Sequence, residues 1–199
     1  MSLRRSYTLI APFYDAVVAA ATRSARSASA AWLADKPPMK VLVSGVGTGL
    51  DLPHLPSGHE YVGLDLTEAM LQRSRPRAGK HTYWPIQGDA MRLPFADHSF
   101  DCAILHLILA VVPNPGQCLL ETARILRPGG HLLVFDKFLK RGEPARLRRL
   151  LNPLSRRVAT RMDVVFEDLL AHAPELELAW DEPVLAGGWF RRLGLNRRT

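Results

Sequence analysis

The chain has 199 residues, of which 47% are hydrophobic, and a formal net charge of +7 at pH 7. A chain of this length buries about 70% of its unfolded surface, so we expect one globular domain. The longest apolar run, 102–112, is far shorter than the roughly 20 residues that span a bilayer. No uninterrupted apolar core follows Arg4 and Arg5. We therefore expect neither a transmembrane helix nor a cleaved signal peptide, and a cytoplasmic location.

An Ala- and Ser-rich helical stretch comes first, over 9–34, and it has no strand partner. Such a helix is free to lie across the mouth of a site. We therefore divide the chain into an N-terminal helical cover, 1–35, and a core, 36–199. The core includes a basic amphipathic segment at 140–161.

The first predicted strand ends in a glycine-rich turn, reading VLVSGVGTGL over 41–50. Gly45, Gly47 and Gly49 alternate there, and a residue without Cβ lets the backbone reach positive φ and lie against a ligand. Asp65 ends the next apolar run, twenty positions after Gly45. An acidic side chain at that spacing accepts hydrogen bonds from ribose hydroxyls. The pattern therefore indicates a nucleotide-binding turn.

The spacing of the glycines separates the cofactor classes. A nicotinamide or flavin fingerprint would place its third glycine at position 50, where this chain has Leu50. The observed G-x-G-x-G favours S-adenosylmethionine. The sequence also has no G-x-x-x-x-G-K-[ST] loop, which argues against a phosphate-gripping NTPase.

Apolar runs alternate with helical patterns, as in a doubly wound parallel sheet with right-handed crossovers. Thr67 caps one predicted helix, and Asn114 with Pro115 opens another that stops at 128–130. Near the end, two strands at 176–185 and 189–196 join through glycines as an antiparallel hairpin. The parallel strands are expected near 40–45, 60–65, 82–87, 100–106 and 131–136.

Positive charge gathers at 140–161, where Leu and Arg recur at helical spacing and Asn152-Pro153 divides two short amphipathic helices. Such charge implies an acidic partner, either lipid headgroups or nucleic acid. The aromatic residues are not interleaved with the basic clusters as base stacking requires, so nucleic acid is disfavoured. A solvated helical face explains the pattern equally well.

Metal and disulfide chemistry find no support in the sequence. It contains no HExxH and no paired CxxC motif, so no metal site is expected. The two cysteines are Cys102, in an apolar run, and Cys118, on a predicted helix. Because free cysteine is among the most buried side chains, we expect both in the core.

Four motifs in order resemble those of class I S-adenosylmethionine-dependent methyltransferases: VSGVGTG at 43–49, GLDLTEAML at 63–71, QGDAMRLPFADHSFD at 87–101 and ARILRPGGHLLVFD at 123–136. The resemblance implies a seven-stranded α/β sheet, mostly parallel with an antiparallel terminal hairpin, in the strand order 3-2-1-4-5-7-6. The opening YTLIAPFYD is similar to that of ubiquinone/menaquinone C-methyltransferases and bacterial phospholipid N-methyltransferases. The closing GGWFRRLGLNRR resembles the phospholipid enzymes more.

The resemblance also implies a set of cofactor contacts. The glycines pass close to the methionine and ribose, Asp65 takes the ribose hydroxyls, and Leu66 and Met70 cover the adenine. Asp89 accepts from the adenine amino group beside the Ala90 amide, although a turn cap is the alternative role for Asp89. The complete expected set is Gly45, Gly47, Thr48, Gly49, Asp51, Asp65, Leu66, Met70, Asp89, Ala90, Met91 and His106.

One position departs from the family pattern. The family usually has Glu or Asp two positions before the first glycine, where it helps to hold the methionine amino group, and this chain has Val43. Asp51, just beyond the glycine turn, could supply the missing charge. It could equally cap a helical turn, and both interpretations stay open.

Methyl transfer from a sulfonium is an in-line displacement, so the protein mainly aligns the reactants and excludes water. A primary ammonium, with a pKa of about 10, must first lose its proton. His106, Tyr7 and Tyr14 are the candidate catalytic residues, and Asp136 is a weaker one. His106 stands at the carboxyl end of a strand, where such sheets bind ligands, but a hydrogen-bonded core histidine is the alternative. The tyrosines could present ring faces to a cation or simply pack.

The favoured function is N-methylation of a phosphatidylethanolamine-like or other lipid-associated amine, which also yields S-adenosylhomocysteine. The basic segment would then hold the protein on the inner membrane surface, at about 1 kcal/mol per basic side chain. A second interpretation is methylation of a soluble amine, carboxylate, thiol or quinone precursor. A third is a catalytically weak protein that binds S-adenosylmethionine or nucleic acid.

Overall fold

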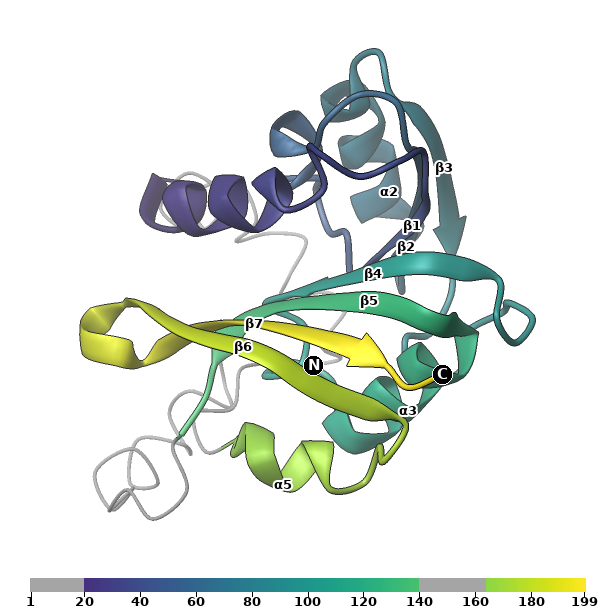
Figure 1. Cartoon of the computed structure of the whole chain (residues 1–199). Helices are drawn as coiled ribbons and strands as arrows, with labels where there is room; N and C mark the ends of the chain where they lie inside the picture. Colours follow the sequence, from purple (N-terminus) through teal and green to yellow (C-terminus); the bar gives the residue numbers. More distant parts are fainter. Residues whose placement is uncertain (1–19, 140–163) are drawn as a thin grey trace.

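A computed structural model describes residues 20–139 and 164–199 (Figure 1). The predicted basic helices at 140–161, and also Tyr7 and Tyr14, lie outside these residues. The described strands are β1 (Lys40–Ser44), β2 (Glu60–Asp65), β3 (Thr82–Gln87), β4 (Phe100–His106), β5 (Leu126–Lys137), β6 (Leu176–Leu185) and β7 (Phe190–Arg197). The helices are one over 20–31, α2 (Glu68–Ser74), α3 (Pro115–Ile125) and α5 (Phe166–Leu170), with 3-10 turns η1 (Leu52–His54), η2 (Arg75–Ala78) and η3 (Ala186–Gly188).

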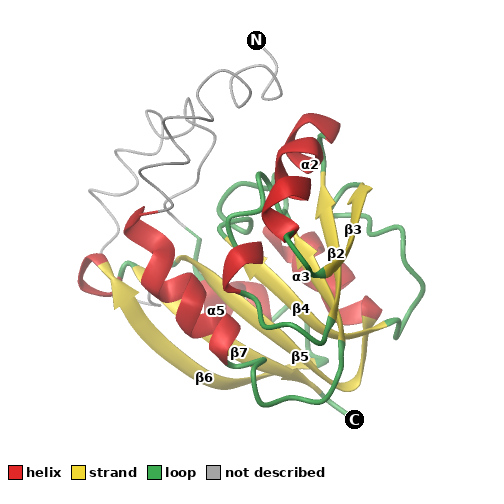
Figure 2. Ribbon diagram, turned by 90° about the horizontal axis from the view of Figure 1, so that it is seen from above, coloured by secondary structure: helices red, strands yellow, loops and turns green. Residues whose placement is uncertain are grey.

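All seven strands form one sheet in the order β3-β2-β1-β4-β5-β7-β6, which confirms the predicted fold class and strand order. β1 to β5 pair in parallel, and β7 is antiparallel to both β5 and β6. The central strands β1 and β4 are buried along nearly their whole length. Parallel strands covered on both faces read as continuous apolar runs, which is why the sequence located them well. Figure 2 shows the progressive twist of the sheet.

Helices cover the sheet on both faces. Figure 1 places the 20–31 helix and α2 above the sheet, and α3 and α5 below it. One apolar cluster joins the lower face to α3 and α5 through residues such as Leu119 and Phe166. The other joins the upper face to the 20–31 helix and α2 through Ala30, Leu33 and Leu71. The 20–31 helix is therefore part of the layer that covers β1 and β4.

The predicted helix boundaries are mostly confirmed. Asn114 caps α3, because its Oδ1 accepts a hydrogen bond from the Gln117 N–H at 3.0 Å, and Pro115 follows at the first helical position. The expected end of this helix at 128–130 is wrong, because α3 ends at Ile125. Leu126 already pairs with β4 as the start of β5. Strand pairing with β4 therefore begins before the chain reaches Gly129 and Gly130.

The C-terminal hairpin has the predicted form, with β6 and β7 joined through Gly187 and Gly188 at φ values of 65° and 92°. Trp180 packs directly over Gly194, where an added Cβ would lie 2.2 Å from the indole ring. The side chain on β6 therefore requires glycine at that point of β7.

Both cysteines lie in the core, as expected, and burial raises the pKa of the Cys118 thiol to about 12. Among residues 20–139 and 164–199, no group of His, Cys, Asp or Glu side chains could hold a metal ion. Within the same ranges, no helix is both long enough and apolar enough to cross a membrane.

Candidate active site

The glycine turn after β1 has the conformation that its sequence predicts. Gly45, Gly47 and Gly49 have φ values of 69°, 55° and 84°. A Cβ at Gly45 would lie 2.5 Å from the Ile108 side chain, whereas one at Gly47 would find only the Gly45 carbonyl, at 3.9 Å. Gly45 is therefore needed for packing, and Gly47 leaves open space against the main chain. That space fits the predicted approach of a cofactor to this turn.

Asp65 meets the glycine turn from the end of β2. Its Oδ2 accepts a hydrogen bond from the Gly47 N–H at 3.0 Å, and its Oδ1 accepts from the Thr67 N–H at 3.0 Å. Burial raises the pKa of the Asp65 carboxyl, although these hydrogen bonds oppose the shift. Thr67 occupies the predicted cap position of α2 but makes no capping hydrogen bond; its hydroxyl donates to Asp65 instead. The structure thus brings together the two predicted parts of the nucleotide site.

The predicted adenine cover lies beside Asp65. Leu66 is 49% exposed, and Met70 lies buried on α2. A half-exposed leucine next to the glycine turn offers an apolar surface to a flat ring. On the other side of the turn, the Thr48 hydroxyl accepts a hydrogen bond from Arg77 at 2.6 Å.

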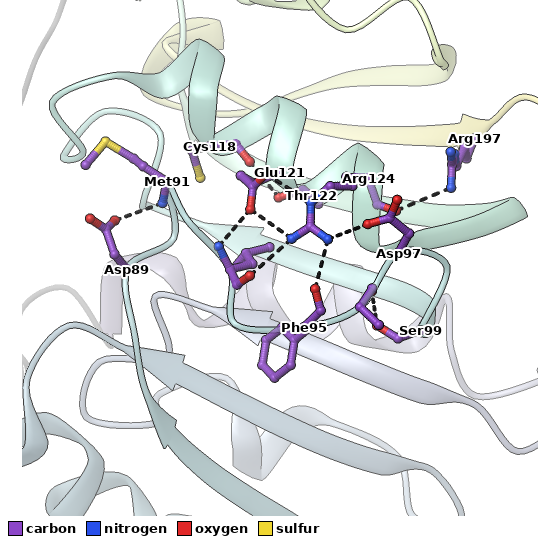
Figure 3. Close-up of polar contacts among 12 residues, drawn as sticks. Asp89, Met91, Phe95, Asp97, Ser99, Cys118, Glu121, Thr122, Arg124 and Arg197 are labelled. Carbon is purple, nitrogen blue, oxygen red and sulfur yellow. Dashed lines mark hydrogen bonds and ion pairs between the residues drawn. The ribbon is translucent and has the colours of Figure 1, made fainter.

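The Asp89–Met91 turn follows β3. Asp89 Oδ1 accepts a hydrogen bond from the Met91 N–H at 2.8 Å, which is the capping role that the sequence left as the alternative (Figure 3). Ala90 is buried in the lower apolar cluster. One oxygen of Asp89 therefore holds the local turn, and its predicted role toward adenine stays a prediction.

Arg124 fixes the loop that follows this turn, and sequence reasoning missed it. Its guanidinium donates to the carbonyls of Leu93 and Phe95 at 3.1 and 2.8 Å and to Asp97 Oδ1 at 2.6 Å (Figure 3). Glu121, three residues earlier on α3, pairs with Arg124 and accepts from the Leu93 N–H at 2.8 Å. Hydrogen bonding to Arg124 lowers the pKa of both Asp97 and Glu121. The i, i+3 acid–base spacing on the helix was the available signal.

His106 ends β4 inside a buried polar network. Its Nδ1 lies 2.6 Å from Asp51 Oδ1, and its Nε2 lies 2.9 Å from the Ser29 hydroxyl on the 20–31 helix. Arg26, on the same helix, donates from Nη1 to Asp51 Oδ1 at 2.6 Å. Burial alone would raise the pKa of Asp51, but the charges and hydrogen bonds of His106 and Arg26 hold it well below its usual range. Asp51 is therefore ionised at neutral pH.

This network bears on two predictions. Asp51 precedes η1 but makes no capping hydrogen bond, so the capping interpretation is wrong. The interpretation that Asp51 supplies the charge missing at Val43 stays a prediction. His106 has hydrogen-bond partners on both ring nitrogens, as the core alternative expects, and its role as a base stays a prediction as well.

Arg26 and Ser29 were not identified as site residues from the sequence. With Thr22, whose hydroxyl accepts from Arg26 Nε at 2.9 Å, they form one buried polar stripe of the helix. Their spacing matches one helical face. Because charged residues are mostly exposed, the pattern was not distinguishable from a solvated face.

Asp136, the weaker catalytic candidate, is fully buried at the end of β5. Its oxygens accept from the backbone N–H groups of Ala110 at 3.0 Å and Lys137 at 2.7 Å, and burial raises its pKa. Its observed contacts therefore hold the loop after β4. In that loop Leu107 has a φ of 58°, which non-glycine residues adopt rarely.

Comparison with known proteins agrees with this geometry. A family model described as a methyltransferase domain matches residues 42–134. A phosphatidylethanolamine N-methyltransferase of Cereibacter sphaeroides is 32% identical over 164 residues, which are 80% of each chain. A ubiquinone/menaquinone biosynthesis C-methyltransferase of Roseobacter denitrificans is 40% identical over 114 residues, 53% of this chain and 45% of that one. The chain thus spans less than half of the quinone enzyme.

The fold has solved relatives. A crystal structure of an S-adenosylmethionine-dependent methyltransferase from Thermotoga maritima superposes with a TM-score of 0.71 at 20% identity, covering 96% of this chain and 98% of that one. At that identity the likeness concerns the fold alone. The glycine turn, its contact with Asp65 and the likeness to the Cereibacter enzyme over 80% of both chains lead to one conclusion: the chain belongs to the class I S-adenosylmethionine-dependent methyltransferases.

Proposed function

We propose that this S-adenosylmethionine-dependent methyltransferase acts on the amine of a phosphatidylethanolamine-like or other lipid-associated acceptor. The observation that carries the proposal is the 32% identity with a phosphatidylethanolamine N-methyltransferase across 80% of both chains. The net charge of +7 supports it, because a basic protein is attracted to anionic membrane surfaces. The protein would then be cytoplasmic and peripheral on the inner membrane surface.

Cofactor contacts are assigned as follows. The open space at Gly47 receives the methionine and ribose, and Asp65 turns toward the ribose hydroxyls. The apolar side chain of Leu66 covers the adenine, and Asp89 accepts from its amino group beside the Ala90 amide. Asp51 holds the methionine ammonium in place of an acid at Val43. The remaining members of the proposed set are Gly45, Thr48, Gly49, Met70, Met91 and His106.

The bound cofactor supplies an electrophilic methyl group on a sulfonium. The chain itself then needs to align the acceptor in line and exclude water. The 20–31 helix supports this role, because its buried polar stripe contacts His106 at the carboxyl end of β4 and Asp51 beyond the glycine turn.

A proton must leave the acceptor ammonium, and His106 is the proposed base. In the form that we propose as the base, His106 donates Nδ1–H to Asp51 and keeps Nε2 free of a proton. In that form, the Ser29 hydroxyl, 2.9 Å from Nε2, is the donor to it. Ser29 must therefore release Nε2, or pass a proton to it, when an acceptor is bound. Tyr7 and Tyr14 are proposed to face the methylated cation.

A second candidate acceptor is a quinone precursor, favoured by the 40% identity with a ubiquinone/menaquinone C-methyltransferase over 114 residues. Parallel reactions with labelled S-adenosylmethionine separate the two, one with phosphatidylethanolamine vesicles and one with a dispersed demethylated quinol. The proposal expects label in the phospholipid. Label only in the quinol would overturn it. The Asp65→Asn variant is the control, since it should lower transfer to either acceptor.

A further inference from the structure

The buried ion pair between Arg26 and Asp51 lies beside the predicted cofactor turn. Asp51 follows Gly49 by two residues, and the side chains of Arg26 and Asp51 are only 6% and 7% exposed. Removing two charges from water is costly, and a buried ion pair is weak evidence for stability on its own. A buried pair at the edge of a ligand cradle therefore calls for a functional explanation.

The hydrogen bonds of this pair are one-sided. Arg26 and His106 both contact Oδ1 of Asp51. Within the described parts of the chain, neither Asp51 Oδ2 nor Arg26 Nη2 takes part in a hydrogen bond. Neither atom belongs to the buried atoms that lack a partner, so both keep some exposed surface. One oxygen and one terminal nitrogen of opposite charge thus remain available to a ligand.

The pair also lies on the correct face of the sheet. Val43, which stands where the family usually has an acid, belongs to the same apolar cluster as Ala30 and Leu33 at the end of the helix that carries Arg26. The space at Gly47 is open as well. The helix that carries Arg26 therefore packs on the face of the sheet where Val43 stands in place of the family's acid.

We propose that Arg26 is a cofactor-binding residue that takes the α-carboxylate of the methionine moiety through its guanidinium, while Asp51 takes the adjacent ammonium. The two protein charges match the ammonium and carboxylate groups that an α-amino acid carries on its α-carbon. A guanidinium presents several donors in a fixed fork, so Arg26 can bind the carboxylate and keep its contact with Asp51. Cofactor binding would then add a second link between the 20–31 helix and the segment after the glycine turn. This inference rests on the assignment of Asp51 made under the proposed function.

The test compares ligands that differ at the amino-acid end. S-adenosylhomocysteine carries both charges, and 5′-methylthioadenosine carries neither. Arg26→Gln should weaken S-adenosylhomocysteine binding by about 10- to 100-fold, as expected for a lost charge-assisted hydrogen bond, and leave methylthioadenosine binding unchanged. Arg26→Lys should recover part of the loss. Arg23→Gln, an exposed change on the same helix, is the matched control.

Titration calorimetry gives each dissociation constant without any acceptor. Equal weakening of both ligands in Arg26→Gln, or no weakening of either, would overturn the inference. Because the variant could fold poorly, the wild-type protein supplies an independent result. Decarboxylated S-adenosylmethionine, which lacks only the carboxylate, should bind about 10- to 100-fold more weakly than S-adenosylmethionine. Equal binding of these two ligands would contradict the role proposed for Arg26 but not the other cofactor contacts. If S-adenosylhomocysteine does not bind the wild-type protein, the whole cofactor assignment is rejected.

Discussion

Two charged clusters of the molecule, one around Asp51 and one around Arg124, differ in exposure. In the first, the side chains of Arg26, Asp51 and His106 are only 2–7% exposed. In the second, Arg124 is 31% exposed and its partner Asp97 is 66% exposed. The first cluster joins side chains to one another, whereas Arg124 also binds main-chain carbonyls. The stability of the first cluster therefore depends on balanced charges away from water, whereas that of the second depends on the geometry of its hydrogen bonds to the main chain.

The largest effect on stability is expected at Asp51. Asp51→Ala leaves Arg26 buried without a counter-charge and His106 without its Nδ1 partner. Breaking a buried pair from one side costs about 3–5 kcal/mol. Urea denaturation should show this loss in the free energy of unfolding, and Asp35→Ala, an exposed change, should show almost none. A loss below about 1 kcal/mol would mean that the cluster is solvated after all.

Two Gly→Ala substitutions in the glycine turn distinguish a glycine that is needed for packing from one that leaves space for a ligand. Gly45→Ala combines positive-φ strain with a contact at 2.5 Å to Ile108, so we expect a loss of about 2–4 kcal/mol in unfolding free energy. Gly47→Ala adds only the strain, about 1–2 kcal/mol, but it fills the proposed cofactor space. Thermal unfolding and titration with S-adenosylhomocysteine measure the two effects. Equal stability losses, with cofactor binding intact in Gly47→Ala, would contradict this division.

A smaller effect is expected at the exposed cluster. Arg124→Met removes two hydrogen bonds to carbonyls of the loop after Asp89, and we expect a loss of about 1–3 kcal/mol in unfolding free energy. If the loop presents the adenine contacts, methylthioadenosine binding should weaken as well. Arg127→Met is the matched control, because Arg127 is 54% exposed and pairs with Asp101. Unchanged ligand binding in Arg124→Met would separate the loop from the adenine site.

The smallest effect concerns acid pH. The folded-state pKa of Asp51 is held well below its unfolded value, so its stabilising contribution is complete above the ordinary Asp pKa of about 4 and is lost as pH falls below that value. Between pH 5 and about 3.5, the unfolding free energy of the wild-type protein should fall by up to about 1 kcal/mol more than that of Asp51→Asn. Denaturation at both pH values tests this. Parallel pH profiles would mean that the pKa of Asp51 is the same in the folded and the unfolded protein.

The sequence was sufficient for the central strands of the sheet because β1 and β4 are local apolar runs, buried on both faces. It was also sufficient for the glycine turn and Asp65, which end the consecutive strands β1 and β2 and meet through one hydrogen bond. It was not sufficient for Arg26 or Ser29. Their partners Asp51 and His106 lie 25 and 77 residues away in the chain, and a charged residue on a helix is normally exposed. Only packing of the helix onto the sheet reveals such contacts.

The end of α3 shows a different limit. The motif at 128–130 is a normal helix stop, but pairing of Leu126 with β4 ends the helix three residues earlier. Because strand pairing sets the end of this helix, the glycine motif predicted that end too far along the chain.

The identity of the methyl acceptor is tested most directly in a single mixture. Purified protein and S-adenosylmethionine are incubated with vesicles that contain phosphatidylethanolamine and a demethylated quinol. Free ethanolamine is present in the surrounding solution, and the three acceptors are supplied in equal amounts. Mass spectrometry then identifies which molecule has gained a methyl group. We predict methylated phosphatidylethanolamine, with the quinol and ethanolamine unchanged. Methylation of the quinol or of ethanolamine, with the phospholipid unchanged, would contradict the proposed function.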